Sequence, residues 1–292
     1  MALIKGSCSM KRLFRRKNNR LFFFLVFCVS VCYTSIPSFA VDALFKETAP
    51  QQSHEGEVRS PGMIQTPVPF SQGEKITYDI KKMGVRAGEA TLVFEGTTEI
   101  RHRPALLIVF TARALNFFDE EKIYLDPLTF YPVFVQRRLN IWGKKEKIEE
   151  EYLPQEAQIK ITKTAGGQTT EQIIEKAGPI ENIYGFIYRC RKDNPFNRKD
   201  PLEIKLPTKD LSIEFVREGK LKAAGQAFDV YFMQSDPRQY SIWFDAGSNR
   251  IPLRIDGAVG FGKTSMIMVE YKKGNAEGSF EIQEVSQKNA PK

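Results

Sequence analysis

The sequence predicts a mainly β protein, and two observations carry this prediction. Between residues 70 and 285, apolar and polar residues alternate over short runs that are rich in β-branched and aromatic side chains. Turn residues interrupt these runs, and connections such as Gly166-Gly167 and Glu218-Gly219 are short enough for hairpins. The strands are therefore expected to pair mainly in the antiparallel sense.

Fourteen segments show this alternation. They are residues 75–81, 87–95, 105–115, 122–125, 132–142, 145–153, 158–164, 169–175, 202–205, 211–216, 227–234, 240–244, 253–255 and 264–271. Segment 105–115 differs from the others because residues such as Ile108 and Phe110 on one face, and Leu107 and Val109 on the other, are all apolar. A strand of this kind is expected to be covered on both faces, by a helix, a second sheet or a ligand.

One segment predicts a helix rather than a strand. Within residues 180–191, Asn182, Gly185, Tyr188 and Arg191 follow one another at a spacing of three, which places them along one stripe of a helix. Gly178-Pro179 before this segment and Asp193-Asn194-Pro195 after it are start and stop signals. This is predicted to be the principal helix.

The first forty residues predict export. Seven Lys and Arg residues precede an apolar run over residues 21–32, and Ser38-Phe39-Ala40 then offers small residues at the two positions that a signal peptidase reads. Cleavage is expected after Ala40. The mature protein is then expected in the periplasm or cell envelope of a Gram-negative bacterium. The alternative is an uncleaved inner-membrane anchor with the rest of the chain outside the cytoplasm.

The rest of the chain divides by composition. Residues 41–70 are rich in Pro, Gln and Ser without a sustained period and predict a flexible tether. Residues 71–286 are expected to form a single β-rich domain, followed by a disordered tail over 287–292.

Charge and cysteine content exclude several partners. The export signal holds seven of the 43 basic residues and none of the 35 acidic ones, so the mature chain is nearly neutral and nucleic acid is not an expected partner. Three of the four cysteines also lie in the signal. Cys190 is then left without an intramolecular disulfide partner, and it is expected to be buried or inert.

Residues 257–264, GAVGFGKT, match the phosphate-loop pattern G-x-x-x-x-G-K-[ST]. That chemistry needs the loop to open a helix, whereas residues 265–271 have the pattern of a strand. The segment is therefore predicted to be a hairpin turn, and ATP is not an expected ligand.

No motif predicts a metal, a cofactor or a catalytic triad. The two histidines, at positions 54 and 102, cannot form a ligand cluster. The acidic runs at residues 119–121 and 149–151 are interpreted as solvated, salt-bridged hairpin surface. Asp79, Asp126 and Asp245 are candidates for a pair of catalytic carboxylates.

Several segments together resemble the exported bacterial family known as domain of unknown function 3108. They are GEKITYDIKKMGVRAGEATL at residues 73–92, Tyr124 to Pro127 with Tyr131-Pro132, the helix stripe ending in Tyr188 and Arg191, and IWFDAGSNRIPLRIDGAVGFG at residues 242–262. The stripe has Asn182 and Gly185 where the family pattern has Asp and Ser. The resemblance implies a curved, largely antiparallel sheet or open barrel with one principal helix, and it implies no known reaction.

These observations favour a non-catalytic envelope protein that holds an apolar or amphipathic ligand, or an envelope partner, in the concavity of its sheet. Arg191 and Tyr188 are the candidate binding residues, with Arg191 anchoring an anionic group. The alternative role of Arg191 is to tie the helix to the sheet. Two other functions stay open, namely an envelope hydrolase acting on glycan or lipid with paired carboxylates, and an assembly factor that offers strand edges to partners.

Overall fold

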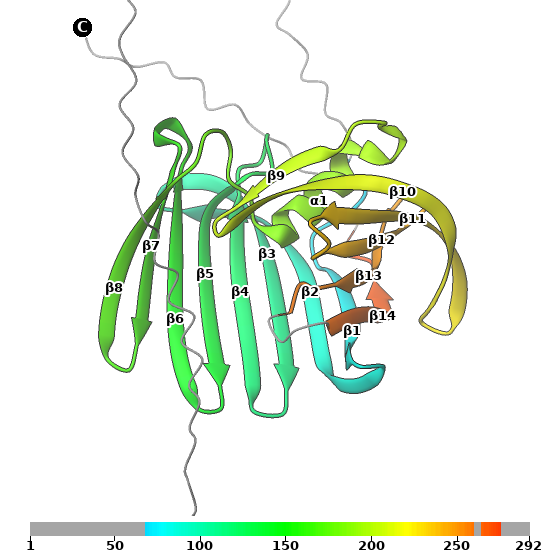
Figure 1. The fold of residues 1–292 in the computed structure, drawn as a ribbon, viewed down its shortest axis with the longest axis horizontal. Coiled ribbons are helices and arrows are strands. Elements are labelled where there is room, and N and C mark those ends of the chain that lie inside the picture. Colours follow the sequence, from blue (N-terminus) through cyan, green and yellow to red (C-terminus); the bar gives the residue numbers. More distant parts are fainter. Residues whose placement is uncertain (1–67, 260–263, 276–292) are drawn as a thin grey trace, which may run out of the picture. The chain divides into compact units, whose positions relative to one another are not determined.

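The computed structural model describes residues 68–259 and 264–275. In this part of the chain there are fourteen strands, one α-helix and two short 3-10 helices, and every strand pair is antiparallel (Figure 1). Each of the fourteen predicted strands is present. The predicted export signal, nearly all of the predicted tether and the predicted tail lie outside the described residues.

The strands are as follows: β1 (Glu74–Lys82), β2 (Val85–Ile100), β3 (Arg103–Ala114), β4 (Phe117–Leu125), β5 (Pro132–Ile141), β6 (Lys144–Leu153), β7 (Gln158–Ala165), β8 (Gln168–Glu175), β9 (Leu202–Leu206), β10 (Lys209–Ala223), β11 (Gln226–Asp236), β12 (Ser241–Asp245), β13 (Pro252–Asp256) and β14 (Thr264–Lys272). The helix is α1 (Ile183–Asp193), and the 3-10 helices are η1 (Pro154–Glu156) and η2 (Pro195–Asn197).

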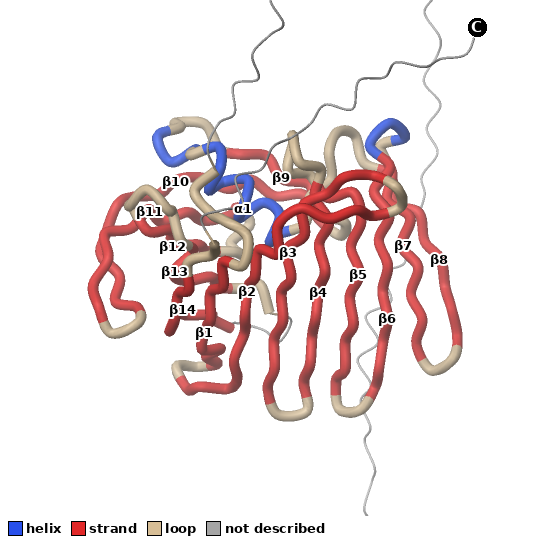
Figure 2. The backbone as a smooth tube through the Cα atoms, turned by 180° about the vertical axis from the view of Figure 1, so that it is seen from behind, coloured by secondary structure: helices blue, strands red, loops and turns tan. Residues whose placement is uncertain are grey.

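All strands belong to one sheet with the order β8-β7-β6-β5-β4-β3-β2-β1-β14-β13-β12-β11-β10-β9. Its edges, β8 and β9, are not paired with each other, so the sheet is not closed into a barrel. The sheet curves around α1, which lies on its inner side (Figures 1 and 2). The prediction of a curved antiparallel sheet or open barrel with one principal helix is confirmed.

Local chemistry explains both ends of α1. Asn182 caps the first turn, because its side-chain oxygen accepts hydrogen bonds from the backbone N–H groups of Tyr184 (2.9 Å) and Gly185 (3.4 Å). Asn194 ends the helix in the left-handed conformation, with φ of 52°. At Gly185 a Cβ atom would lie 3.0 Å from Leu125 Cδ2, so a residue without a side chain lets the helix approach β4 closely.

The structure corrects two expectations about the strands. Glu218-Gly219 is not a turn, because β10 continues through it to a hairpin at Ala224-Gly225. The outer face of β3 also has no second layer among the described residues, since α1 lies against the inner face. Leu107 and Val109 on the outer face are half-buried between the side chains of β2 and β4.

The segment between β13 and β14 has the geometry of a turn at both of its described ends. Gly257 has a φ of +86°, and its N–H donates to the carbonyl oxygen of Thr264 (3.0 Å). A Cβ atom at Gly257 would clash with the carbonyl oxygen of Gln239, so glycine is required there. Thr264 begins a strand rather than a helix, which removes the helix N-terminus that a phosphate loop needs. Residues 260–263 of the motif lie outside the described residues.

No helix within residues 68–259 and 264–275 has both the length and the apolar character needed to cross a bilayer.

Candidate functional site

Arg191 lies at the C-terminal end of α1 and is completely buried. Its guanidinium forms a bidentate ion pair with Glu74 of β1, with distances of 2.6 Å from Nη1 to Oε1 and 2.8 Å from Nη2 to Oε2. Arg191 Nε also donates to the carbonyl oxygen of Asn249 (3.2 Å), and Tyr271 donates to Glu74 Oε2 (3.0 Å). Residues from four segments far apart in sequence therefore meet at one buried arginine.

The second predicted binding residue, Tyr188, is also fully buried and lies beside this ion pair. The Arg191 guanidinium carbon lies 5.1 Å from the centre of the Tyr188 ring and 4.9 Å from that of Phe70. Burial raises the pKa of the Tyr188 hydroxyl well above its usual value, with a further contribution from Glu74. Both residues thus come together as predicted, but they do so inside the core.

These contacts favour the role of Arg191 as a tie between helix and sheet. All three of its nitrogens donate to protein acceptors, and its central carbon lies near two aromatic rings. Tyr188 differs, because its hydroxyl has no hydrogen-bond partner among the residues that the structure describes. Ligand anchoring by these two residues stays a prediction, and the stability measurement in the Discussion tests it.

A second buried charge cluster lies on the inner face of β4, β5 and β6. Arg137 of β5 pairs with Asp119 of β4 through Nε to Oδ1 (2.8 Å) and Nη2 to Oδ2 (2.5 Å). Glu121 lies one position further along the same face, with Oε1 3.3 Å from Arg137 Nε, and its Oε2 accepts from Asn182 (3.2 Å). Asp119 and Glu121 are only 2% and 8% exposed, so these two carboxylates are removed from water, whereas the Arg137 side chain is partly exposed.

This acidic cluster carries more negative charge than one arginine balances. Burial is the main cause that raises the pKa of Glu121 to about 7. The negative charges of Asp119 and Glu150 contribute to this increase, and the positive charge of Arg137 offsets only part of it. Burial likewise raises the pKa of Glu150, although Tyr152 donates a hydrogen bond to its Oε2 (2.7 Å). The pKa of Glu121 therefore lies well above that of an exposed glutamate.

The prediction that residues 119–121 form solvated hairpin surface is wrong for two of the three. Alternate residues of a strand face opposite sides. Glu120 faces outward and pairs with Arg138, whereas Asp119 and Glu121 lie in the inward row between Phe117 and Ile123. That apolar row was a usable signal in the sequence. The same holds for Glu150, which faces inward beside Tyr152.

A cleft of about 550 Å³ lies at the rim of the sheet where β4 ends and β5 begins. Its walls are the start of β3, the β4–β5 loop, the end of β6 with η1, and the segment that precedes α1. Most of the lining side chains are apolar, and five of them are prolines: Pro104, Pro127, Pro132, Pro154 and Pro179. Its volume lies within the range of small-molecule sites.

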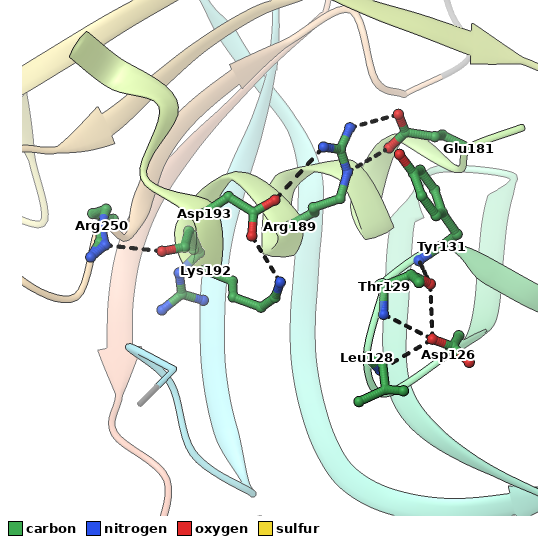
Figure 3. Close-up of polar contacts among 10 residues, drawn as sticks. Asp126, Leu128, Thr129, Tyr131, Glu181, Arg189, Lys192, Asp193 and Arg250 are labelled. Atoms are coloured by element: carbon green, nitrogen blue, oxygen red, sulfur yellow. Dashed lines mark hydrogen bonds and ion pairs between the residues drawn. The ribbon is translucent and has the colours of Figure 1, made fainter. Parts of the chain in front are cut away.

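The β4–β5 loop forms one wall of this cleft, and the side chain of Asp126 fixes the conformation of the loop (Figure 3). Asp126 Oδ1 accepts hydrogen bonds from the N–H groups of Leu128 (3.1 Å) and Thr129 (2.8 Å), and from the Thr129 hydroxyl (2.8 Å). Leu128 is held 61% exposed at the mouth. Arg189 of α1 lies over the ring of Tyr131 and pairs with Glu181, which ties the loop to the helix.

The floor of the cleft connects it to the acidic cluster. Tyr152 and Ile180 line the cleft and belong to the hydrophobic core. The Tyr152 hydroxyl donates to Glu150. Burial, and then Glu121, raise the pKa of the buried Tyr184 hydroxyl, which has no hydrogen-bond partner within the described part of the chain. The rim cleft is thus apolar at its walls and polar beneath its floor.

The catalytic carboxylates proposed from the sequence are not brought together. Asp79 pairs with Arg86 and alternates with the inward-facing Tyr78 and Ile80 of β1, Asp126 organises the rim loop, and Asp245 ends β12. Among the described residues, no hydrogen bond or ion pair joins any two of these three. The carboxylates that do converge, Asp119, Glu121 and Glu150, come from β4 and β6.

Other residues of interest are buried in the core or show no arrangement for metal binding. Phe94 is fully buried against Phe70 and Tyr188. Cys190 is buried, and burial raises the pKa of its thiol. Within residues 68–259 and 264–275, no group of three His, Cys, Asp or Glu side chains is placed to hold a metal ion.

Residues 76–269 match the family described as "Protein of unknown function (DUF3108)". The chain belongs to this family. The match runs from β1 to β14, so it includes the rim cleft, the acidic cluster and α1 of this DUF3108 protein. A search of curated proteins finds no match.

Solved structures with some likeness to this DUF3108 chain include a β-barrel-like protein of domain of unknown function DUF1849 from Brucella abortus. It is 8% identical, with a TM-score of 0.44 over 72% of this chain and 100% of that one. A protein provisionally described as a lipoprotein from Parabacteroides distasonis is 10% identical, with a TM-score of 0.23 over 70% of this chain and 98% of its own.

Proposed function

We propose that this chain is an exported, non-catalytic protein of the cell envelope, located in the periplasm, that holds an apolar or amphipathic ligand in the rim cleft. The cleft itself is the observation that carries the proposal. It is large enough for a small molecule, and its apolar walls come from four separate segments. Burial of a ligand's apolar surface between these walls supplies the free energy of binding.

The walls are held in place before any ligand arrives, which favours a preformed site. Asp126 orders the β4–β5 loop on one side. On the other side, Glu181 N donates to the carbonyl oxygen of Lys205 (2.7 Å), and Lys176 Nζ donates to that of Leu206 (2.6 Å). These bonds fasten the segment before α1 to β9, so little conformational entropy is lost when the cleft fills.

Export is supported by the basic flank, the apolar run and the Ser38-Phe39-Ala40 site of the sequence. We expect the protein recovered from the envelope fraction to begin at Val41 when its N-terminus is sequenced. Full-length chain in the inner membrane would favour the anchor instead. Full-length chain in the cytosol would contradict export.

The cleft is tested at Leu128, because this side chain is exposed at the mouth and its replacement leaves the core intact. Leu128→Lys places a charge against apolar walls. We expect it to weaken binding of the neutral fluorescent probe N-phenyl-1-naphthylamine by about tenfold, with little change in melting temperature. Val216→Lys, at a 42% exposed position of β10 outside the cleft, is the matched control.

Native mass spectrometry of protein purified from its own envelope provides the second measurement. A bound small molecule on the wild type, absent from Leu128→Lys, is the expected result. Equal probe binding by wild type, Leu128→Lys and Val216→Lys would place the apolar site elsewhere. Absence of both probe binding and a co-purifying molecule would contradict the proposed function.

A second candidate function is an envelope hydrolase, and the acidic cluster is the observation that favours it. Glu121, with a pKa of about 7, lies beside Asp119 on the inner face of β4, and a pair of neighbouring carboxyl groups can supply an acid and a base. Hydrolysis of glycan or lipid substrates that is lost in both Glu121→Gln and Asp119→Asn, with folding retained, would replace the first proposal. Both side chains are buried, however, and a buried carboxyl group is poorly placed to reach a substrate, so we prefer the first proposal, a ligand-binding protein, to the hydrolase.

A further inference from the structure

Large apolar side chains are exposed together at one rim of the sheet. Among the eight exposed large hydrophobic residues of the described chain, four lie at or next to hairpin turns at this rim. They are Met83 (93% exposed), Val85 (70%), Leu115 (84%) and Trp142 (71%). Scattered single apolar residues are ordinary on a protein surface, but a cluster of this kind marks an interaction surface.

The three turns that carry these residues are neighbours. They connect β1 to β2, β3 to β4 and β5 to β6, and these six strands are consecutive in the sheet. Figures 1 and 2 show the hairpins side by side along the lower rim. The Trp142 N–H also donates to the carbonyl oxygen of Asn116 (2.8 Å), which joins two of the turns directly. We name this surface, formed by residues 82–86, 115–116 and 142–145, the tip surface.

The backbone conformation at two of these turns disfavours large apolar residues. Met83 and Trp142 have φ of 52° and 53°, in the left-handed region that bulky residues rarely adopt. Two-residue hairpin turns of this kind favour Asn, Asp or Gly at these positions. At the opposite rim, the corresponding turn between β2 and β3 carries the polar pair Arg101-His102. A large apolar residue at a strained, exposed turn position lowers stability, so a function outside the fold accounts for it better.

Basic side chains surround the exposed apolar residues. Lys82, Arg86, Lys144 and Lys145 are all exposed and lie within three residues of a turn. Arg86 pairs with Asp79 and Glu89, whereas Lys82, Lys144 and Lys145 form no ion pair with any described residue. Apolar tips with a tryptophan, flanked by unpaired lysines, are complementary to a lipid surface with anionic headgroups.

We propose that the tip surface is a membrane-binding surface, whose apolar turns enter the headgroup region of an anionic bilayer while the lysines contact its phosphates. This inference does not depend on the ligand of the rim cleft, which lies at the opposite rim. It adds a second membrane contact to the signal or anchor predicted from the sequence. Binding here would hold the sheet with its strands directed toward the bilayer.

Trp142 provides a direct test, because the chain contains only two tryptophans. Replacing the other one, Trp243, with phenylalanine keeps a ring between Phe232 and Arg254 and leaves Trp142 as the reporter. We expect vesicles containing phosphatidylglycerol to shift Trp142 emission to shorter wavelength, and brominated acyl chains to quench it. Phosphatidylcholine vesicles and added salt should weaken both effects.

The matched variant is Met83→Asn with Trp142→Asn, in the otherwise wild-type protein. Asparagine suits the left-handed turn, so the melting temperature should stay the same or rise. Flotation with phosphatidylglycerol vesicles should fall by at least about tenfold, because two apolar insertions are lost. Two control variants should float like the wild type: Ala224→Asn, at another left-handed turn position, and Ile173→Thr, at another exposed apolar position.

Three outcomes would overturn the proposal. Unchanged flotation of the Asn variant would show that other residues bind lipid. No flotation and no shift in Trp142 emission with any vesicle would show that the surface does not bind lipid. A Trp142 shift produced by protein concentration alone, in the absence of vesicles, would identify the tip surface as a contact between copies of the chain.

Discussion

Arg191→Ala is expected to lower the free energy of unfolding by on the order of 3–5 kcal/mol. The change removes both hydrogen bonds to Glu74 and leaves that carboxylate buried and uncompensated. It also leaves a space where the guanidinium packed beside the rings of Phe70 and Tyr188. It also releases the carbonyl oxygen of Asn249. Urea unfolding of wild type and variant measures the difference.

Two further variants separate the ion pair from other effects. Arg198→Ala, at an exposed position just after η2, should change the free energy of unfolding by no more than about 0.5 kcal/mol. The double variant Glu74→Met with Arg191→Met should be more stable than Arg191→Ala, because no unpaired charge is then buried. A double variant as unstable as Arg191→Ala would show that the ion pair is not the source of the loss.

The Arg191→Ala variant also decides whether Arg191 anchors a ligand. A fully stable Arg191→Ala protein that no longer carries a co-purifying molecule would support the binding role and contradict the tie. A large loss of stability, with ligand occupancy unchanged in the folded fraction, would leave Arg191 as part of the architecture. The contacts of its guanidinium lead us to expect the second result.

Glu121→Gln is expected to remove a fall in stability between about pH 5 and pH 7. The folded protein holds the Glu121 proton up to a pKa of about 7, whereas the unfolded chain releases it near 4.5. Between these values the folded state binds more protons than the unfolded state, so its stability falls as the pH rises. The loss is about 3 kcal/mol over this window.

Glutamine resembles the protonated side chain at every pH. Glu121→Gln should therefore be more stable than the wild type at pH 8, and its free energy of unfolding should vary less with pH. Glu120→Gln is the matched control, because Glu120 is its neighbour on the opposite, outward face of β4. Urea unfolding at intervals between pH 5 and pH 8 gives the curves. A difference between wild type and Glu121→Gln that does not vary with pH would contradict the raised pKa.

Much of the fold was predictable because strands and helix ends depend on neighbouring residues. Alternation marked all fourteen strands, and Asn182 and Asn194 lie at the two ends of α1 that the stop and start signals bracketed. The first half of β4, residues 117–121, was not predicted as a strand, and it shows where such local patterns fail. Asp119 and Glu121 look like surface residues when they are read as a run of charge, and only their alternation with Glu120 places them inward.

The candidate sites depended on contacts between distant segments. Arg191 and Glu74 are 117 positions apart, and the rim cleft takes its walls from four segments between residues 103 and 180. Local sequence patterns give the conformation of each segment but not which segments meet. The pairing order and the curvature of the sheet bring these side chains together. Local patterns are therefore sufficient to predict the strands, the helix and the family. Contacts between distant segments set which buried charges face each other and where an apolar cleft and an apolar rim remain.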